Sequence, residues 1–269
     1  MRIATYDRTV YQHNPLAEVV CQLRFKNAQR VDESTVALIA AELAKAGYPL
    51  VGEGEVTFVL EIELSSQSGP PIPSQSRVFH FLSEDREWKV SVCRDFIAFS
   101  TDKYLNWPDF AARLKAAVGA YFAAQPSCRL GRLGLRYKDL IEREEIGLDG
   151  VSWDELIQSF LLGPLAPDSL DDNQRATEDD VDAFTSQSML RLSDARVLLT
   201  SALLISSSNS SQRAFLIDAD FFNEGDFSCD IASESEGLMR ELDALHLHAG
   251  ALFRRSIKDK LHYALCPSN

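Results

Sequence analysis

A long alternating segment, from Arg129 to Ile141, constrains the fold of this chain most strongly. Apolar and polar residues take turns along it, which is the pattern of a strand with one buried face and one outward face. The buried face is predicted to carry Leu133, Leu135, Tyr137 and Ile141, and the outward face Arg132, Gly134, Arg136 and Lys138. The segment therefore predicts one long strand whose outward face carries three cations.

Shorter strands come before and after this one, in adjacent runs rather than alternating singly with helices. The first run is predicted at 17–25, 55–64, 77–82, 88–93 and 96–100, and the second at 189–192, 196–205 and 213–221. Such runs favour an α+β fold with antiparallel sheet over a doubly wound parallel fold. We therefore predict antiparallel β-meanders in two halves, each packed against a long amphipathic helix.

Three helices are predicted. One follows the first strand, one follows the first run of strands, and one follows the last strand. The first starts near residue 33, and the second opens at Trp107, where the following proline suits a first helical turn. The last starts near Ser233 or Ser235, and its apolar residues keep a 3.6-residue period through Leu261. The final segment is therefore predicted to be one continuous helix.

The domain organisation follows from a gap in the pattern. Residues 1–141 are predicted to form an N-terminal α+β half, and 189–269 a C-terminal meander with its helix. Between them, 142–188 reads as an acidic irregular connector. Its segment Asp168 to Asp182 holds seven acids and one base, which is typical of a solvated, mobile loop. No sequence repeat supports a duplication of the two halves.

Composition narrows the function classes. Lys and Arg number 27 against 40 Asp and Glu, which gives a net charge of −13 and counts against non-specific nucleic-acid binding. No stretch is apolar enough for a signal peptide or a membrane span. The five cysteines are scattered, so we expect a reduced, cytoplasmic protein without a membrane association. Nucleotide, hydrolase and zinc-protease motifs are absent, and no cofactor is expected.

The outward face of the long strand is the first candidate site. Arginine suits bidentate binding of a carboxylate or phosphate, so Arg132 and Arg136, with a glycine between them, could cradle an anion. Glu18 and Arg24 are likewise predicted to lie on the outward face of the first strand. The alternative is structural, because acids such as Glu18, Glu61 and Glu63 on neighbouring strands could neutralise the cations. Both interpretations stay open.

A second candidate is the pair Asp218 and Asp220, which share one face of an otherwise apolar strand. Paired carboxylates can hold Mg²⁺ for phosphoryl transfer or nuclease chemistry. That chemistry also needs a third acid and a phosphate clamp, and the sequence places neither. The structural alternative is a pair of ordinary aspartates near a turn.

Aromatic and histidine candidates complete the set. Tyr104 and Trp107 cluster with Phe110 at the opening of the second helix, where they could form a ligand wall or part of the core. His246 lies beside apolar residues of the last helix and is predicted to be packed and hydrogen-bonded, with a functional site as the alternative.

Several motifs also resemble a sporadically distributed prokaryotic family of uncharacterised proteins. They are the stretch Asn14 to Phe25, the tract Tyr104-x-x-Trp107-x-x-Phe110, Arg132 to Tyr137, and the ending from Leu245-His246 to Asp259. One departure is Lys138-Asp139, where the family pattern has an apolar residue and then asparagine. The resemblance implies no known activity or catalytic residue, and it implies an accessory gene of defence or mobile-element type.

The sequence therefore predicts a non-enzymatic binding or interaction protein with a site on the charged sheet face. Its partner would be another protein or a small anionic ligand, and a homo-oligomer is compatible with the sequence. The alternative is a metal-dependent phosphoryl-transfer or nuclease-type enzyme using Asp218 and Asp220. In a third interpretation, the acidic loop Asp168 to Asp182 docks on a basic partner and orders there.

Overall fold

The computed structural model describes residues 1–4, 6, 9–52, 55–59, 74–126, 128–167, 176–206, 212–227 and 231–268. Of residues 55–59, 74–76 and 231–235 it describes the backbone alone. The end of the predicted strand 55–64, with Glu61 and Glu63, and the acidic residues 168–175 therefore lie outside the described residues.

The chain divides into two compact units. Unit 1 comprises Met1–Val19, Gly134–Asn223 and Arg240–Asn269, and unit 2 comprises Val20–Leu133 and Glu224–Met239. Strands β2 (Leu16–Phe25), β8 (Leu130–Glu142) and β11 (Arg213–Phe227) contribute residues to both units. The unit boundaries thus fall inside strands, and neither unit coincides with the contiguous segments 1–141, 142–188 and 189–269.

Unit 2 contains the predicted N-terminal meander. Strands β5 (Ser74–Leu82), β6 (Trp88–Val92) and β7 (Phe96–Thr101) pair antiparallel in sequence order, with β3 (Leu50–Val51) and β4 (Glu55–Val59) both on β5. Helix α1 (Glu33–Lys45) starts at Asp32, whose carboxylate accepts a hydrogen bond from the Thr35 amide at 2.9 Å. Helix α2 (Trp107–Ala124) packs against α1 and β7. The predicted α+β class and antiparallel sheet are confirmed.

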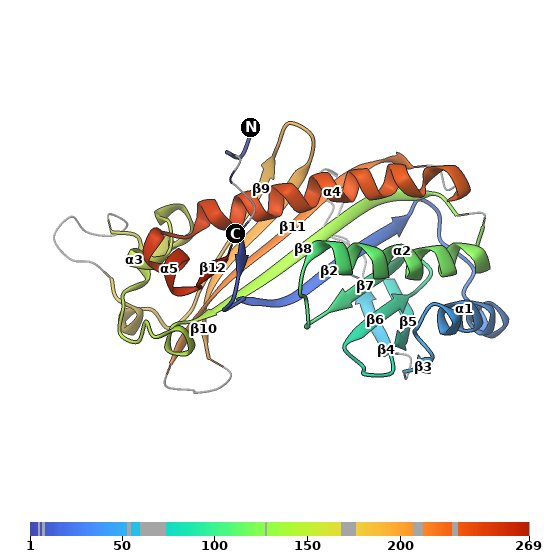
Figure 1. Ribbon diagram of the computed structural model, residues 1–269, viewed down its shortest axis with the longest axis horizontal. Coiled ribbons are helices and arrows are strands. Elements are labelled where there is room, and N and C mark those ends of the chain that lie inside the picture. Colours follow the sequence, from blue (N-terminus) through green and yellow to red (C-terminus); the bar gives the residue numbers. More distant parts are fainter. Residues whose placement is uncertain are drawn as a thin grey trace. The chain divides into compact units, whose positions relative to one another are not determined.

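Unit 1 contains the C-terminal meander. Strands β9 (Phe184–Arg191), β10 (Arg196–Ile205) and β11 pair antiparallel, and the order of neighbours continues to β8 and β2. Short strands β1 (Val10–Tyr11) and β12 (Pro267–Ser268) pair with each other. Within this unit, helix α4 (Ile231–Ser256) covers one face of β8 and β11, where His246 contacts Tyr137 and His248 stacks on Phe221 (Figure 1).

The prediction of one continuous final helix is wrong. Helix α4 ends at Ser256, and a separate helix α5 (Asp259–Ala264) follows. Between them Ile257 forms an antiparallel bridge with Ile157. The Lys258 amide donates to the Leu156 carbonyl at 2.7 Å, and the Gln158 amide donates to the Ser256 carbonyl at 2.9 Å. Because this backbone pairs with another segment, it cannot continue the helical ladder.

The connector contains short helical segments within residues 142–188. It holds helix α3 (Trp153–Leu156) and several 3-10 turns, one of them at Glu178–Asp180. The Glu178 carboxylate accepts from Arg143 Nη2 at 2.7 Å and from Trp153 Nε1 at 2.6 Å, and the Arg143 guanidinium stacks on the Trp153 ring. The mobility of the loop from Asp168 to Asp182 stays a prediction, and within its described residues Glu178 makes these contacts.

Candidate functional site

The two rival candidates of the sequence, Arg136 and Asp218, are each other's partner. Arg136 Nε and Nη2 donate to the two carboxylate oxygens of Asp218 at 2.7 and 2.5 Å. The Asp218 side chain is 10% exposed, whereas that of Arg136 is 45% exposed. Hydrogen bonding to Asp218 raises the pKa of the Arg136 guanidinium above its ordinary value, against the opposing effect of burial. Fork-to-fork pairs of this kind are both strong and directional.

Further charges surround this pair. Lys138 Nζ lies 3.4 Å from Glu18 Oε2, and Asp220 and Glu18 both interact electrostatically with Arg136. Cross-strand ion pairs therefore occupy Arg136 and Lys138, as the structural interpretation of this face requires. The partner of Arg136 is Asp218, which the sequence did not suggest, while Glu18 was foreseen as a neutralising acid and pairs with Lys138.

The pair belongs to a row of polar side chains that crosses four strands. Thr200 on β10 lies opposite Asp218 on one side and opposite Gln187 of β9 on the other. Gln187 Nε2 donates to Thr200 Oγ1 at 3.2 Å. We call the sequence Gln187, Thr200, Asp218 and Arg136 the polar row. It runs across β9, β10, β11 and β8 on the face opposite α4.

Apolar side chains flank the polar row on both sides. Leu198 is half-buried and lies opposite Met189 on one neighbouring strand and Asp220 on the other. On the other side of the row, Ala202 lies opposite the half-buried Leu216. Met189 and Leu204 are 41% and 37% exposed. We call this surface the open face, made of the polar row with Met189, Leu198, Leu204, Leu216 and Asp220.

The remaining candidates of the sheet hypothesis lie in unit 2. Arg132 Nη1 approaches Gln22 Oε1 at 3.5 Å, and Arg24 lies near enough to Cys93 to lower the pKa of that thiol, which burial raises more strongly. Glu18, Arg136 and His246 belong to unit 1. The charged candidates are therefore distributed over both units, and each set is engaged with neighbours of its own.

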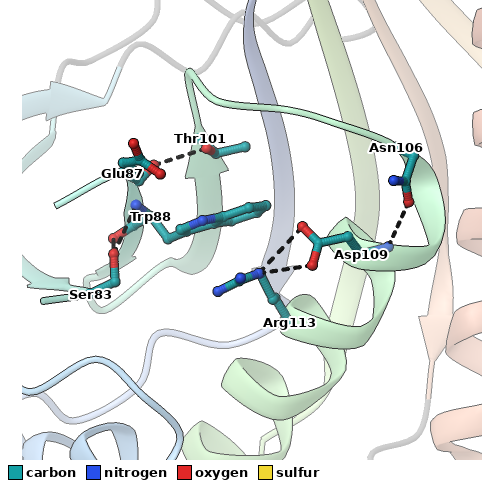
Figure 2. A network of polar contacts seen from close by, with 7 residues as sticks. All are labelled: Ser83, Glu87, Trp88, Thr101, Asn106, Asp109 and Arg113. Atoms are coloured by element: carbon teal, nitrogen blue, oxygen red, sulfur yellow. Dashed lines mark hydrogen bonds and ion pairs between the residues drawn. The ribbon is translucent and has the colours of Figure 1, made fainter. Parts of the chain in front are cut away.

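The aromatic candidates belong to the core of unit 2. Trp107 is 6% exposed and stacks on the fully buried Phe110 at 5.8 Å, while the half-buried Tyr104 also contacts Phe110. Asn106 caps α2 by accepting from the Asp109 amide, and Asp109 holds Arg113 over the Trp88 ring (Figure 2). These contacts fix the start of α2 against the meander. They match the core interpretation rather than that of a ligand wall.

His246 is packed and hydrogen-bonded, as predicted. Its Nδ1 lies 2.8 Å from the Tyr137 hydroxyl, and the two rings are in tilted contact. Tyr137 is adjacent to Arg136 on β8, so its side chain points to the opposite face of the sheet. His246 is therefore part of the α4 packing and not part of the open face.

Asp139 was not among the candidate residues that the sequence suggested. This residue lies on the buried face of β8 and is 6% exposed. Burial, and secondarily the charge of Asp218, raise the pKa of the Asp139 carboxyl to about 8. The signal was present in the sequence, because Asp139 has the same parity as Leu135, Tyr137 and Ile141.

The metal hypothesis finds little support in this geometry. Both oxygens of Asp218 accept hydrogen bonds from Arg136. Across the described part of the chain, no three His, Cys, Asp or Glu side chains are grouped so that they could hold a metal ion. The third carboxylate that two-acid phosphoryl chemistry needs is therefore not supplied by these residues.

Comparison with known proteins adds no identification: no family model matches the chain, and no curated protein matches it significantly. Among the described residues, no helix is both long and apolar enough to cross a membrane.

Proposed function

We propose that this protein is a non-enzymatic binding protein that associates through the open face of unit 1. The observation that supports this most directly is the arrangement of that face, a polar row between two sets of half-exposed apolar side chains. In an antiparallel sheet with one solvated face, the outward positions are ordinarily polar. Leucine and methionine gathered on an outward face favour an interaction surface.

The chemistry of the open face favours a protein over a small anion. Arg136 already binds a carboxylate through both arms of its guanidinium, so its fork is occupied. Lys138 forms a longer ion pair with Glu18, at 3.4 Å. An anionic ligand would have to displace Asp218, which is largely buried. A protein surface needs no such displacement, because it can cover the ion pair and the flanking leucines together.

The occupant that we propose is a second copy of this chain. The five charged residues gathered around Arg136 are two cations, Arg136 and Lys138, and three acids, Glu18, Asp218 and Asp220, so their sum is 2 − 3 = −1. The whole chain carries −13. Two copies therefore repel least where the local charge is close to zero, and two open faces can pack as aligned sheets in an isologous dimer.

A charge placed in the apolar part of the open face tests this proposal. Leu198→Glu would bury an unpaired carboxylate in the dimer, so we expect the dissociation constant to rise by about 100-fold or more. Leu247→Glu is the matched control, because Leu247 is 69% exposed on α4, away from the open face. Sedimentation equilibrium would measure both. A wild-type protein that is monomeric, or a Leu198→Glu dimer as tight as the control, would contradict the proposal.

The prokaryotic family resemblance and the cytoplasmic location remain predictions. The resemblance supports an accessory role, of defence or mobile-element type, for such a binding protein. The metal-dependent enzyme is the weaker candidate, because its principal aspartate is committed to Arg136.

A further inference from the structure

The break between α4 and α5 creates a cavity of about 390 Å³ in unit 1. Three distant parts of the chain line it: Tyr6 from the N-terminal segment, Gln158 from the connector, and the helix junction from Arg254 to Asp259. The bridge between Ile157 and Ile257 holds the connector against the junction. A volume of this size falls in the range of small-molecule sites, roughly 300–1,000 Å³.

The lining of this cavity is cationic. Arg254, Arg255 and Lys258 contribute three positive charges against the one negative charge of Asp259, so the sum is 3 − 1 = +2 in a chain that carries −13. Cations in the last turn of α4 complement the helix dipole. The dipole does not account for Lys258, which lies beyond the helix, or for the convergence of Tyr6 and Gln158 on the same cavity.

Some of these groups are already engaged and others are not. Arg254 Nη2 donates to Asp259 at 2.8 Å, and its guanidinium lies over the Tyr6 ring. Lys258 Nζ donates to the Asp154 carbonyl at 2.5 Å, and Arg255 Nη1 approaches the Tyr6 hydroxyl at 3.5 Å. No carboxylate of the described residues forms an ion pair with Arg255 or Lys258. The Gln158 side-chain amide likewise has no hydrogen-bond partner among the residues that the structure describes.

We infer that this cavity binds a small organic or inorganic oxyanion that carries at least two negative charges. Apart from Ile257 and Asp259, the residues that line it carry donors: guanidinium groups, an ammonium, an amide and a hydroxyl. A carboxylate or phosphate group accepts from all four kinds of donor, and the planar guanidinium fork of Arg255 can donate to two oxygens of either group. Phosphate esters and polycarboxylates share this chemistry. The site is independent of the open face, because different elements form it.

Isothermal titration calorimetry on the full chain tests the inference, with pyrophosphate and citrate as probes at constant ionic strength. Binding of pyrophosphate alone would identify a phosphate ligand, and binding of citrate alone a carboxylate ligand. Either result, or binding of both, supports the site. Absence of binding of both probes up to about 10 mM would overturn it.

Two variants locate the binding. Arg255→Gln removes an exposed guanidinium with one weak contact, so the fold should persist, and we expect the affinity for the bound probe to fall by about tenfold or more. Gln158→Ala should also weaken binding. Lys260→Gln is the control, because Lys260 pairs with Glu155 and does not line the cavity. An equal loss in Lys260→Gln and Arg255→Gln would show a general field effect and contradict the site.

Discussion

Asp139→Asn is expected to stabilise the protein at pH 7, by up to about 4 kcal/mol. The pKa of this carboxyl is about 8 in the fold because burial disfavours its charged form, and near 4 in the unfolded chain. Between these values the folded protein retains a proton that the unfolded chain has lost. The stability that the protonated carboxyl contributes is therefore complete below about pH 4 and is lost as the pH rises through about 8.

Urea unfolding of both proteins between pH 4 and pH 8 measures this effect. We expect the free energy of unfolding of the variant to exceed that of the wild type by a margin that grows with pH and nearly vanishes at pH 4. Asp149→Asn, at an exposed position of the same unit, is the control and should follow the wild type. A margin for Asp139→Asn that is constant over this range would contradict a buried carboxyl with a raised pKa.

Arg136→Ala is expected to destabilise the protein by about 2–3 kcal/mol. Asp218 is 10% exposed, so removal of its guanidinium partner leaves a largely buried carboxylate without compensation. Thermal or urea unfolding of the purified variant measures the loss. Arg136→Lys keeps the charge but removes the two-armed geometry, so it should recover part of this stability.

Two further variants make this prediction specific to the pair. Lys138→Ala breaks an ion pair whose members are each about one third exposed, so it should cost under about 1 kcal/mol. The double variant Arg136→Ala, Asp218→Ala should be more stable than Arg136→Ala alone, because it removes the buried charge as well. Equal effects of Arg136→Ala and Lys138→Ala would show that the Arg136–Asp218 pair contributes nothing beyond a surface ion pair.

Much of the fold could be predicted because the deciding information is local. The alternation from Arg129 to Ile141 predicted β8, which spans Leu130–Glu142. Trp107 with a proline in the first turn predicted the start of α2. Such patterns depend on period and capping within a few residues, which a sequence displays directly.

The prediction of one continuous final helix failed because the end of that helix depends on contacts between distant segments. The end of α4 at Ser256 is set by pairing with the connector about a hundred positions earlier, which no periodicity in the helix reveals. The contacts of Glu178 with Arg143 and Trp153 also join distant segments, so composition could not show them.

The candidate site likewise has a part that local patterns predicted and a part that only long-range contacts determine. Parity along the strands placed Arg136 on the outward face of β8, and it placed Asp218 and Asp220 on one face of β11 without showing that Asp218 meets Arg136. It could not show that β8 and β11 are neighbours whose Arg136 and Asp218 side chains meet, because strand order is not encoded locally. Two hypotheses that seemed independent in the sequence thus turned out to share one ion pair. The cavity beside α5 escaped notice because it forms only where the predicted helix breaks.

Native mass spectrometry of the wild-type chain over a range of concentrations tests the proposed function most directly. Our account predicts a species of twice 30.0 kDa that dissociates to the single chain on dilution. The dimer should be lost in Leu198→Glu and retained in Leu247→Glu. A wild-type chain that stays at 30.0 kDa at every concentration would contradict association through the open face.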